Sequence, residues 1–135
     1  MVRIIEGGMY TDERGVVAFV NGFNFKDIKR FYVVYNHNKG YFRGWHGHKH
    51  EEKYIYVVSG SARIGVVNIE TNEMHSFLLE ARTPKIIYVP PGHANGFLSL
   101  TDDTKVIFFS NMTLEESQAD ITRFPPDTWC MQDKA

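Results

Sequence analysis

Short runs of β-branched and aromatic residues recur along the chain, separated by clusters of Gly, Asn, Asp and Pro. Runs of this length and composition are typical of β-strands, and no long segment repeats its apolar residues with the period of a helix. The pattern therefore predicts an all-β protein. The predicted strands are residues 9–10, 16–20, 30–35, 53–58, 62–68, 73–79, 85–89, 96–100 and 105–110, with hairpin turns at residues 11–15 and 70–72.

Two of these runs, residues 31–35 and 54–58, are apolar at successive positions and so on both faces of a strand. Both faces must then be covered. The interior of a barrel covers one face, and a second sheet or a partner subunit covers the other. We therefore predict a homodimer, with a self-contained sandwich as the alternative.

The pattern changes after the last predicted strand. Thr113 followed by Glu116 fits a capping box, which predicts one short helical turn. The prolines at residues 125–126 then exclude a regular element. We expect a short C-terminal arm that lays Phe124 and Trp129 on the barrel.

Length and composition indicate one globular domain over residues 1–135. The 43% of hydrophobic residues suffices for a substantial core, and the net charge of −1 gives no basic surface for nucleic acid or an anionic membrane. The single cysteine, Cys130, excludes an intrachain disulfide. No apolar run has the length of a signal sequence core or a transmembrane helix, so we expect a cytoplasmic protein.

The segment from Arg43 to Gly60 carries the densest set of ionisable side chains. It nearly matches the first metal-binding motif of the cupin β-barrels, Gly-x5-His-x-His-x4-Glu-x6-Gly, with His46 and His48 in place and Lys53 at the acidic position. A Lys ammonium has no lone pair to give to a metal. The motif predicts a cupin, that is, a jelly-roll β-barrel, that has lost its metal.

The second cupin motif, Pro-x-Gly-x2-His, is matched by residues 90–95 except that Asn95 replaces the histidine. Two histidines and an amide would make a poor zinc site, even with His93 as a third ligand. We therefore predict no metal and no cofactor, and keep a metal-dependent cupin as the weakest alternative. A histidine beside a lysine suits proton transfer next to a carbonyl group, because the imidazole is a base and the ammonium stabilises an enolate.

Three ordered motifs carry a family resemblance: Arg-Gly-x-His at residues 43–46, Lys-x6-Gly at residues 53–60, and the segment 87–97 ending in His-Ala-Asn-Gly-Phe. Together they resemble the dTDP-4-dehydrorhamnose 3,5-epimerase family. The resemblance implies a metal-free jelly-roll dimer that acts on a nucleoside-diphospho-4-keto-6-deoxyhexose in deoxysugar or surface polysaccharide biosynthesis.

The resemblance also implies roles for individual residues. His46 would be the base beside the ketone, Lys53 would lie near the enolate and Arg43 would hold the pyrophosphate. Apart from the resemblance, we expect Asn95, His93 and Tyr35 to contact the substrate.

The chain departs from the epimerase pattern at the residues that complete the reaction. The family has a tyrosine as the opposing acid just after the last core strand, and residues 108–113 contain none. Tyr35, His48, His93 and water remain as candidate acids. The family's aspartate partner of the base is also missing, and Asp127 is a conceivable substitute.

A second resemblance, to the dTDP-4-keto-6-deoxyglucose 3,4-ketoisomerases, rests on Asp-Ile-Lys-Arg-Phe-Tyr at residues 27–32 and Arg-Gly-x-His-x-His-Lys at residues 43–49. A pair of imidazoles, His46 and His48, can move protons between adjacent carbons on one face of a sugar. We predict an epimerase, with 3,4-ketoisomerisation as the first alternative. A non-catalytic module that binds a sugar nucleotide or a carbohydrate is the second.

Overall fold

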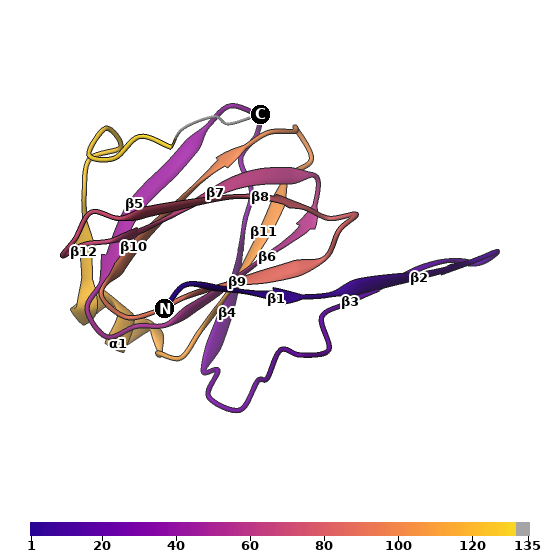
Figure 1. Ribbon diagram of the computed structural model, residues 1–135, viewed down its shortest axis with the longest axis horizontal. Helices are drawn as coiled ribbons and strands as arrows, with labels where there is room; N and C mark the ends of the chain where they lie inside the picture. The colour runs from indigo at the N-terminus through magenta and orange to yellow at the C-terminus, as the bar shows by residue number, and fades with distance from the viewer. Residues whose placement is uncertain (132–135) are drawn as a thin grey trace.

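The computed structural model describes residues 1–131 and consists mainly of two antiparallel five-stranded sheets that face each other (Figure 1). The first sheet has the order β1 (Arg3–Glu6), β9 (Lys85–Val89), β6 (Lys53–Ser59), β11 (Lys105–Ser110) and β4 (Arg30–Val34). The second has the order β12 (Ile121–Arg123), β5 (Phe42–His48), β10 (His93–Ser99), β7 (Ser61–Asn68) and β8 (Met74–Glu80). The all-β prediction is confirmed.

The two sheets do not close into one hydrogen-bonded barrel among the described residues, which agrees with the double-sheet form of a jelly roll. They form a sandwich whose edges stay separate, with β4 at one edge of the first sheet and β12 at one edge of the second. The predicted domain also includes residues 132–135, which lie outside the described part.

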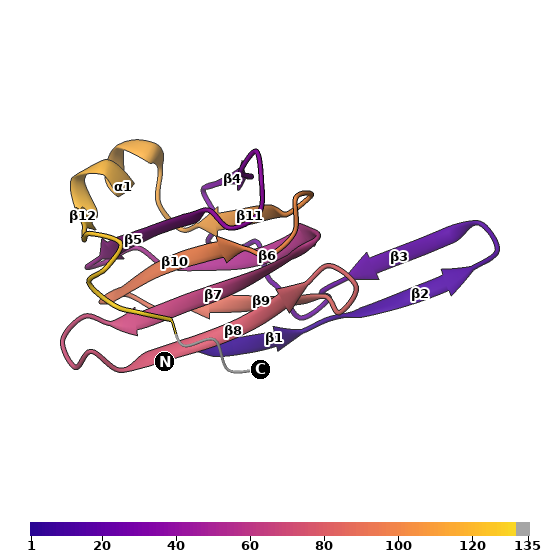
Figure 2. The same cartoon turned by 90° about the horizontal axis from the view of Figure 1, so that it is seen from above.

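A separate hairpin of β2 (Gly8–Asp12) and β3 (Gly15–Phe19) projects from the sandwich (Figures 1 and 2). The sequence pattern missed three strands: β1, β5 and β12. β1 and β12 are four and three residues long. β5 contains two glycines and two histidines, so it lacks the apolar alternation by which strands are found.

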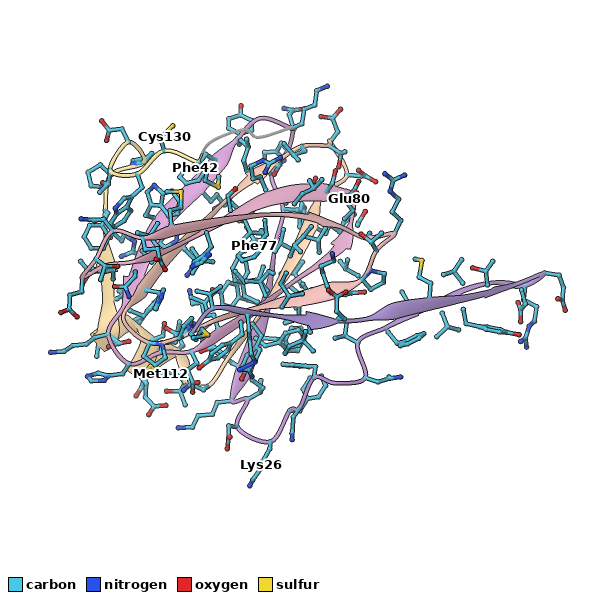
Figure 3. The ribbon with its side chains drawn as sticks, in the orientation of Figure 1. Lys26, Phe42, Phe77, Glu80, Met112 and Cys130 are labelled. Carbon is cyan, nitrogen blue, oxygen red and sulfur yellow. The ribbon has the colours of Figure 1, made fainter. Side chains whose placement is uncertain are left out.

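The main core lies between the sheets (Figure 3, around Phe77). Each fully buried Ile or Val there contributes roughly 1.5–3 kcal/mol relative to an exposed one. This layer holds the sheets as a rigid frame for the polar residues at one end. Its fully buried members include Ile55, Val57, Ile64, Val66, Ile87 and Val106.

The C-terminal arm packs on the outer face of the second sheet, as predicted. Phe124 and Trp129 contact a second buried cluster around Trp45. The indole N–H of Trp45 lies 3.1 Å from the carbonyl oxygen of Pro126 and 3.2 Å from that of Trp129, and donates to both.

The predicted capping box is present and begins helix α1 (Leu114–Asp120). The Thr113 hydroxyl accepts from the Glu116 N–H, and the Glu116 carboxylate accepts from the Thr113 N–H. The helix is longer than the single turn expected, and it buries Ser117. Figure 2 shows α1 and β4 at the same edge of the sandwich. The described residues contain no helix long and apolar enough to span a membrane.

Candidate active site

A cavity of about 420 Å³ lies between the two sheets at the edge formed by β4 and β12. Both sheets and α1 contribute to its walls. The first sheet supplies Arg30, Tyr32, Val34, Lys53 and Phe108; the second supplies Arg43, His46, His48, Asn95, Phe97, Ile121 and Arg123; and α1 supplies Leu114, Ser117 and Gln118.

Five of the predicted site residues meet in this cavity: Arg43, His46, His48, Lys53 and Asn95. His46 and His48 share a face of β5, as their even spacing predicts. Asn95 of β10 lies directly opposite His46 in the ladder. Lys53 begins β6 in the facing sheet, so the lysine reaches the cavity from the wall opposite the histidines.

A bulge in the β5–β10 ladder brings Arg43 to the same side as His46. Asn95 pairs with His46, whereas Phe97, two residues further, pairs with Arg43, three residues back. The extra residue in β5 reverses the alternation of side chains, so residues at odd spacing face one cavity. Gly44 allows this approach, because a Cβ there would lie 2.9 Å from the Cα of Gly96.

Tyr35 does not line the cavity, which differs from the prediction. β4 ends at Val34, and alternate residues of this strand, Arg30, Tyr32 and Val34, face inward. Tyr35 follows the outward series and is 58% exposed. The sequence pattern could not fix this parity, because the strand is apolar on both faces.

His93 and Asp127 also lie outside the cavity. His93 is at the first residue of β10, where its Nδ1 lies 2.9 Å from the carbonyl oxygen of Pro91, and it lines a different cavity on the β5 side. Asp127 is exposed in the C-terminal arm. Neither is placed to act on a molecule beside His46.

His46 is a neutral imidazole at ordinary pH. Burial, followed by the positive charges of Lys53 and Arg123, lowers the pKa of His46 to about 4. An unprotonated imidazole in a cationic cavity can accept a proton from a bound molecule.

Lys53 is 5% exposed and its Nζ lies 5.7 Å from the ring centroids of both Tyr32 and Phe108. Burial lowers the pKa of Lys53 to about 8, while the negative charge of Glu51 opposes this shift. The group is therefore a cation at neutral pH, and its mostly apolar surroundings strengthen its attraction to a developing oxyanion.

Glu51 is the residue that sequence reasoning missed most clearly. It is 1% exposed, and its carboxylate accepts from the Ser110 hydroxyl at 2.5 Å and the Ser117 hydroxyl at 2.7 Å. Burial alone would raise the pKa of Glu51, but contacts with His48, Ser110 and Ser117 outweigh it and lower the pKa to about 2. Nothing in the sequence distinguishes Glu51 from the polar residues beside it.

Glu51 and Asp120 lie beside the imidazole of His48. The His48 Nδ1 lies 2.9 Å from the Glu51 carboxylate and 3.8 Å from that of Asp120. By distance these are ion pairs, yet neither ring nitrogen of His48 has a hydrogen bond of good geometry with a described residue. The Nδ1 of this buried ring faces the Glu51 carboxylate, and the ring lines the cavity wall next to His46.

With this geometry in place, comparison with known proteins gives the family. The FdtA family, described as WxcM-like, C-terminal, matches residues 1–125. The chain belongs to this family. No curated protein matches the chain.

Solved structures show the same fold. The RmlC epimerase of Mycobacterium tuberculosis is 25% identical, with a TM-score of 0.77 over 90% of this chain and 68% of its own. ChmJ, a 3'-monoepimerase from Streptomyces bikiniensis, is 20% identical, with a TM-score of 0.80 over 93% of this chain and 70% of its own. QdtA, a sugar 3,4-ketoisomerase from Thermoanaerobacterium thermosaccharolyticum, is 21% identical, with a TM-score of 0.73 over 91% of this chain and 88% of its own. These likenesses confirm the cupin jelly-roll class for this member of the FdtA family.

One group of side chains in this FdtA-family site has the composition of a metal site. Ligand atoms of His48, Glu51 and Asp120 lie within 4.8 Å of one another. The two carboxylates already have partners: Glu51 accepts from two serines, and Asp120 accepts from the backbone N–H groups of His50 and Glu51. The Arg30 guanidinium, 3.8 Å from Glu51, adds a positive charge beside them. The group is therefore better described as a carboxylate cluster that positions His48 than as a cation site.

We expect Glu51→Gln to destabilise the protein by about 1–3 kcal/mol at pH 7, since an amide cannot replace a carboxylate that accepts two hydroxyl hydrogen bonds beside an imidazole. The folded-state pKa of about 2 lies below the unfolded value of 4.5. The stabilisation by Glu51 is thus present above pH 4.5 and is lost as pH falls toward 2.

Urea denaturation at pH 7, 5, 4 and 3 measures both effects. The difference between wild type and variant should shrink as the pH decreases. Glu70→Gln, in the exposed turn after β7, is the matched control and should change little. Equal stability of wild type and Glu51→Gln at pH 7 would contradict the role of this carboxylate.

Proposed function

We propose that this protein is an isomerase that removes a proton next to the C4 ketone of a nucleoside-diphospho-4-keto-6-deoxyhexose and inverts that carbon. The observation that carries the proposal is the pairing of a neutral imidazole, His46, with a buried ammonium, Lys53, on facing walls of one cavity. The similar structures include epimerases, and one of them holds dTDP-quinovose.

The proposed chemistry follows from the two protonation states. A hydrogen on a carbon beside a ketone is acidic, because the negative charge that it leaves spreads onto the carbonyl oxygen. His46 takes this proton, and Lys53 stabilises the enolate oxygen. A positioned base contributes roughly 10²–10⁴-fold in rate, and one donor to a developing oxyanion contributes roughly 10²–10³-fold.

The diphosphate of the substrate would lie at the cationic mouth of the cavity. Arg43 is held by its Nε, which donates to the Asn36 amide oxygen at 2.7 Å, so the outer edge of the guanidinium is left for a ligand. Arg123 of β12 lies opposite His46 in the ladder and is also exposed. Two guanidinium groups suit a pyrophosphate, because each can donate two parallel hydrogen bonds to it.

One observation favours a second product, the 3-keto isomer. His48 lines the same wall as His46, two residues further along β5. Two imidazoles on one wall can remove a proton from one carbon and return it to the next on the same face of the sugar. This 3,4-ketoisomerisation is the second candidate, and a module that only binds sugar nucleotides is the third.

We expect His46→Asn to reduce hydrogen exchange by at least about 100-fold, because the base is lost while the shape of the cavity is kept. The substrate is dTDP-4-keto-6-deoxyglucose in heavy water, with deuterium located by NMR. Inversion with deuterium at C3 or C5 supports the epimerase, and a migrated ketone supports the ketoisomerase. His75→Asn, on the exposed face of β8, is the matched control. Wild-type exchange no faster than that of His46→Asn would contradict both enzyme proposals.

We expect kcat/KM to follow a bell-shaped pH profile. His46 must be unprotonated, so activity should rise as pH increases through about 4, its pKa in the fold. Lys53 must be protonated, so activity should fall as pH increases through about 8. Lys53→Met should lose roughly 100-fold in rate. The activity of this variant should no longer fall as pH increases through about 8. A wild-type rate that still increases above pH 9 would contradict the role of Lys53.

We also propose that the protein is a homodimer formed through the outer face of the first sheet and the projecting hairpin. Phe31, Val33 and Tyr35 of β4 and its end are 65%, 44% and 58% exposed, and in the hairpin Tyr10 and Val17 are 61% and 60% exposed. Figure 3 shows the hairpin side chains away from the rest of the chain. Apolar surface of this extent is typical of an interface.

A location in the cytoplasm stays a prediction.

Phe31→Asp should convert the dimer into a monomer, since it places a charge at the most exposed apolar side chain of β4. Light scattering coupled to gel filtration measures the mass. Glu70→Lys, in the exposed turn after β7 of the second sheet, is a control that changes charge away from the proposed interface. A wild-type protein that is monomeric at 100-fold different concentrations would contradict the proposed dimer.

A further inference from the structure

An epimerase needs a proton donor that faces its base, and the described residues supply it at a position other than those expected. The segment after β11 contains no tyrosine, and Tyr35 and His93 lie outside the cavity. The remaining tyrosine of the cavity wall is Tyr32 of β4.

The ladder between β4 and β11 holds Tyr32 in a fixed orientation. Tyr32 pairs with Phe108, and their rings stack with centroids 5.0 Å apart and an interplanar angle of 10°. The guanidinium carbon of Arg30 lies 4.8 Å from the Tyr32 ring centroid, and the Lys53 Nζ lies 5.7 Å from it. The ring is thus confined between an aromatic face and two cations.

Tyr32 and His46 come from opposite walls. Tyr32 belongs to the sheet of β4, β11 and β6, and His46 belongs to the sheet of β5 and β10. A planar enolate bound between the sheets has one face toward each wall. A proton removed on the His46 side and returned on the Tyr32 side inverts the carbon.

We propose that Tyr32 is the acid that protonates the enolate on the face opposite His46. This inference rests on the proposed function and names the missing half of its acid–base pair.

In the proposed inversion, the substrate loses one proton to His46 and gains one from Tyr32. The C–H bond breaks and its proton goes to the His46 ring, while the electron pair moves to the ketone oxygen beside Lys53. The enolate then collapses, the O–H bond of Tyr32 breaks and a new C–H bond forms on the other face. The imidazolium and the phenolate that remain exchange protons with water in the open cavity.

Two properties of Tyr32 suit this role. Burial raises the pKa of the Tyr32 phenol, and the negative charge of Glu51 raises it further, so the group carries its proton when substrate arrives. Arg30 opposes this shift and stabilises the phenolate after transfer. Within residues 1–131 the Tyr32 hydroxyl has no hydrogen-bond partner, so it is free to donate to a ligand.

Tyr32→Phe tests the inference with dTDP-4-keto-6-deoxyglucose in heavy water. The variant removes one oxygen and keeps the ring stacked on Phe108. We expect inverted product to form at least 100-fold more slowly, while deuterium still enters the starting sugar with retention of configuration, because His46 can return a deuteron to its own side. Such exchange also proves that the variant is folded. Tyr35→Phe is the matched control and should invert at the wild-type rate.

The outcomes separate this inference from the proposed function. Inversion by Tyr32→Phe at the wild-type rate overturns the role of Tyr32 and leaves the epimerase intact. Loss of both exchange and inversion, with an unchanged circular dichroism spectrum, also overturns it, because Tyr32 would then act in binding. If wild type exchanges no hydrogen, both proposals fall. If it exchanges hydrogen but only migrates the ketone, the epimerase and the Tyr32 inference fall while proton abstraction stands.

Discussion

The cavity depends on one buried carboxylate, Glu51. This side chain lies in the connection between β5 and β6, and it receives hydroxyl groups from the end of β11 and from α1. It therefore ties the helix to both sheets at the point where the cavity opens. A buried carboxylate without such partners would cost several kcal/mol, so the serines, the imidazole of His48 and the cation of Arg30 must assemble together. The position of His48 is a consequence of this assembly.

The same carboxylate sets the balance of charge in the cavity. Arg30, Arg43, Lys53 and Arg123 all line it, and Glu51 is buried behind them. The excess of positive charge has two effects that support each other. It adds to burial, the larger cause, in keeping His46 unprotonated, which a base requires, and it attracts an anionic diphosphate. A base of low pKa is a weak proton acceptor in water, but the nearby Lys53 lowers the energy of the enolate and so makes the weaker base sufficient.

Much of the fold and part of the site could be predicted from the sequence. Apolar alternation located the strands that bury one face, and spacing between motifs brought His46, His48, Lys53 and Asn95 into one cavity. The pattern failed where its physical basis is weak. β5 is rich in glycine and histidine, and β4 is apolar on both faces, so the sequence does not show which of Tyr32 and Tyr35 points inward. The burial of Glu51 depends on Ser117, which is distant in sequence, and no local signal marks such a contact.

The parity of β4 decides more than the choice between two tyrosines. Because alternate residues of a strand point to opposite sides, one strand serves two surfaces. Its inward series, with Tyr32, faces the histidines across the cavity, and its outward series, with Phe31 and Tyr35, lies on the exposed apolar face. Any partner that covers this face also braces β4, an edge strand that pairs only with β11 among the described residues. A shift of one residue in that ladder would exchange the two series. The proposed proton donor and the apolar surface are therefore fixed by a single register.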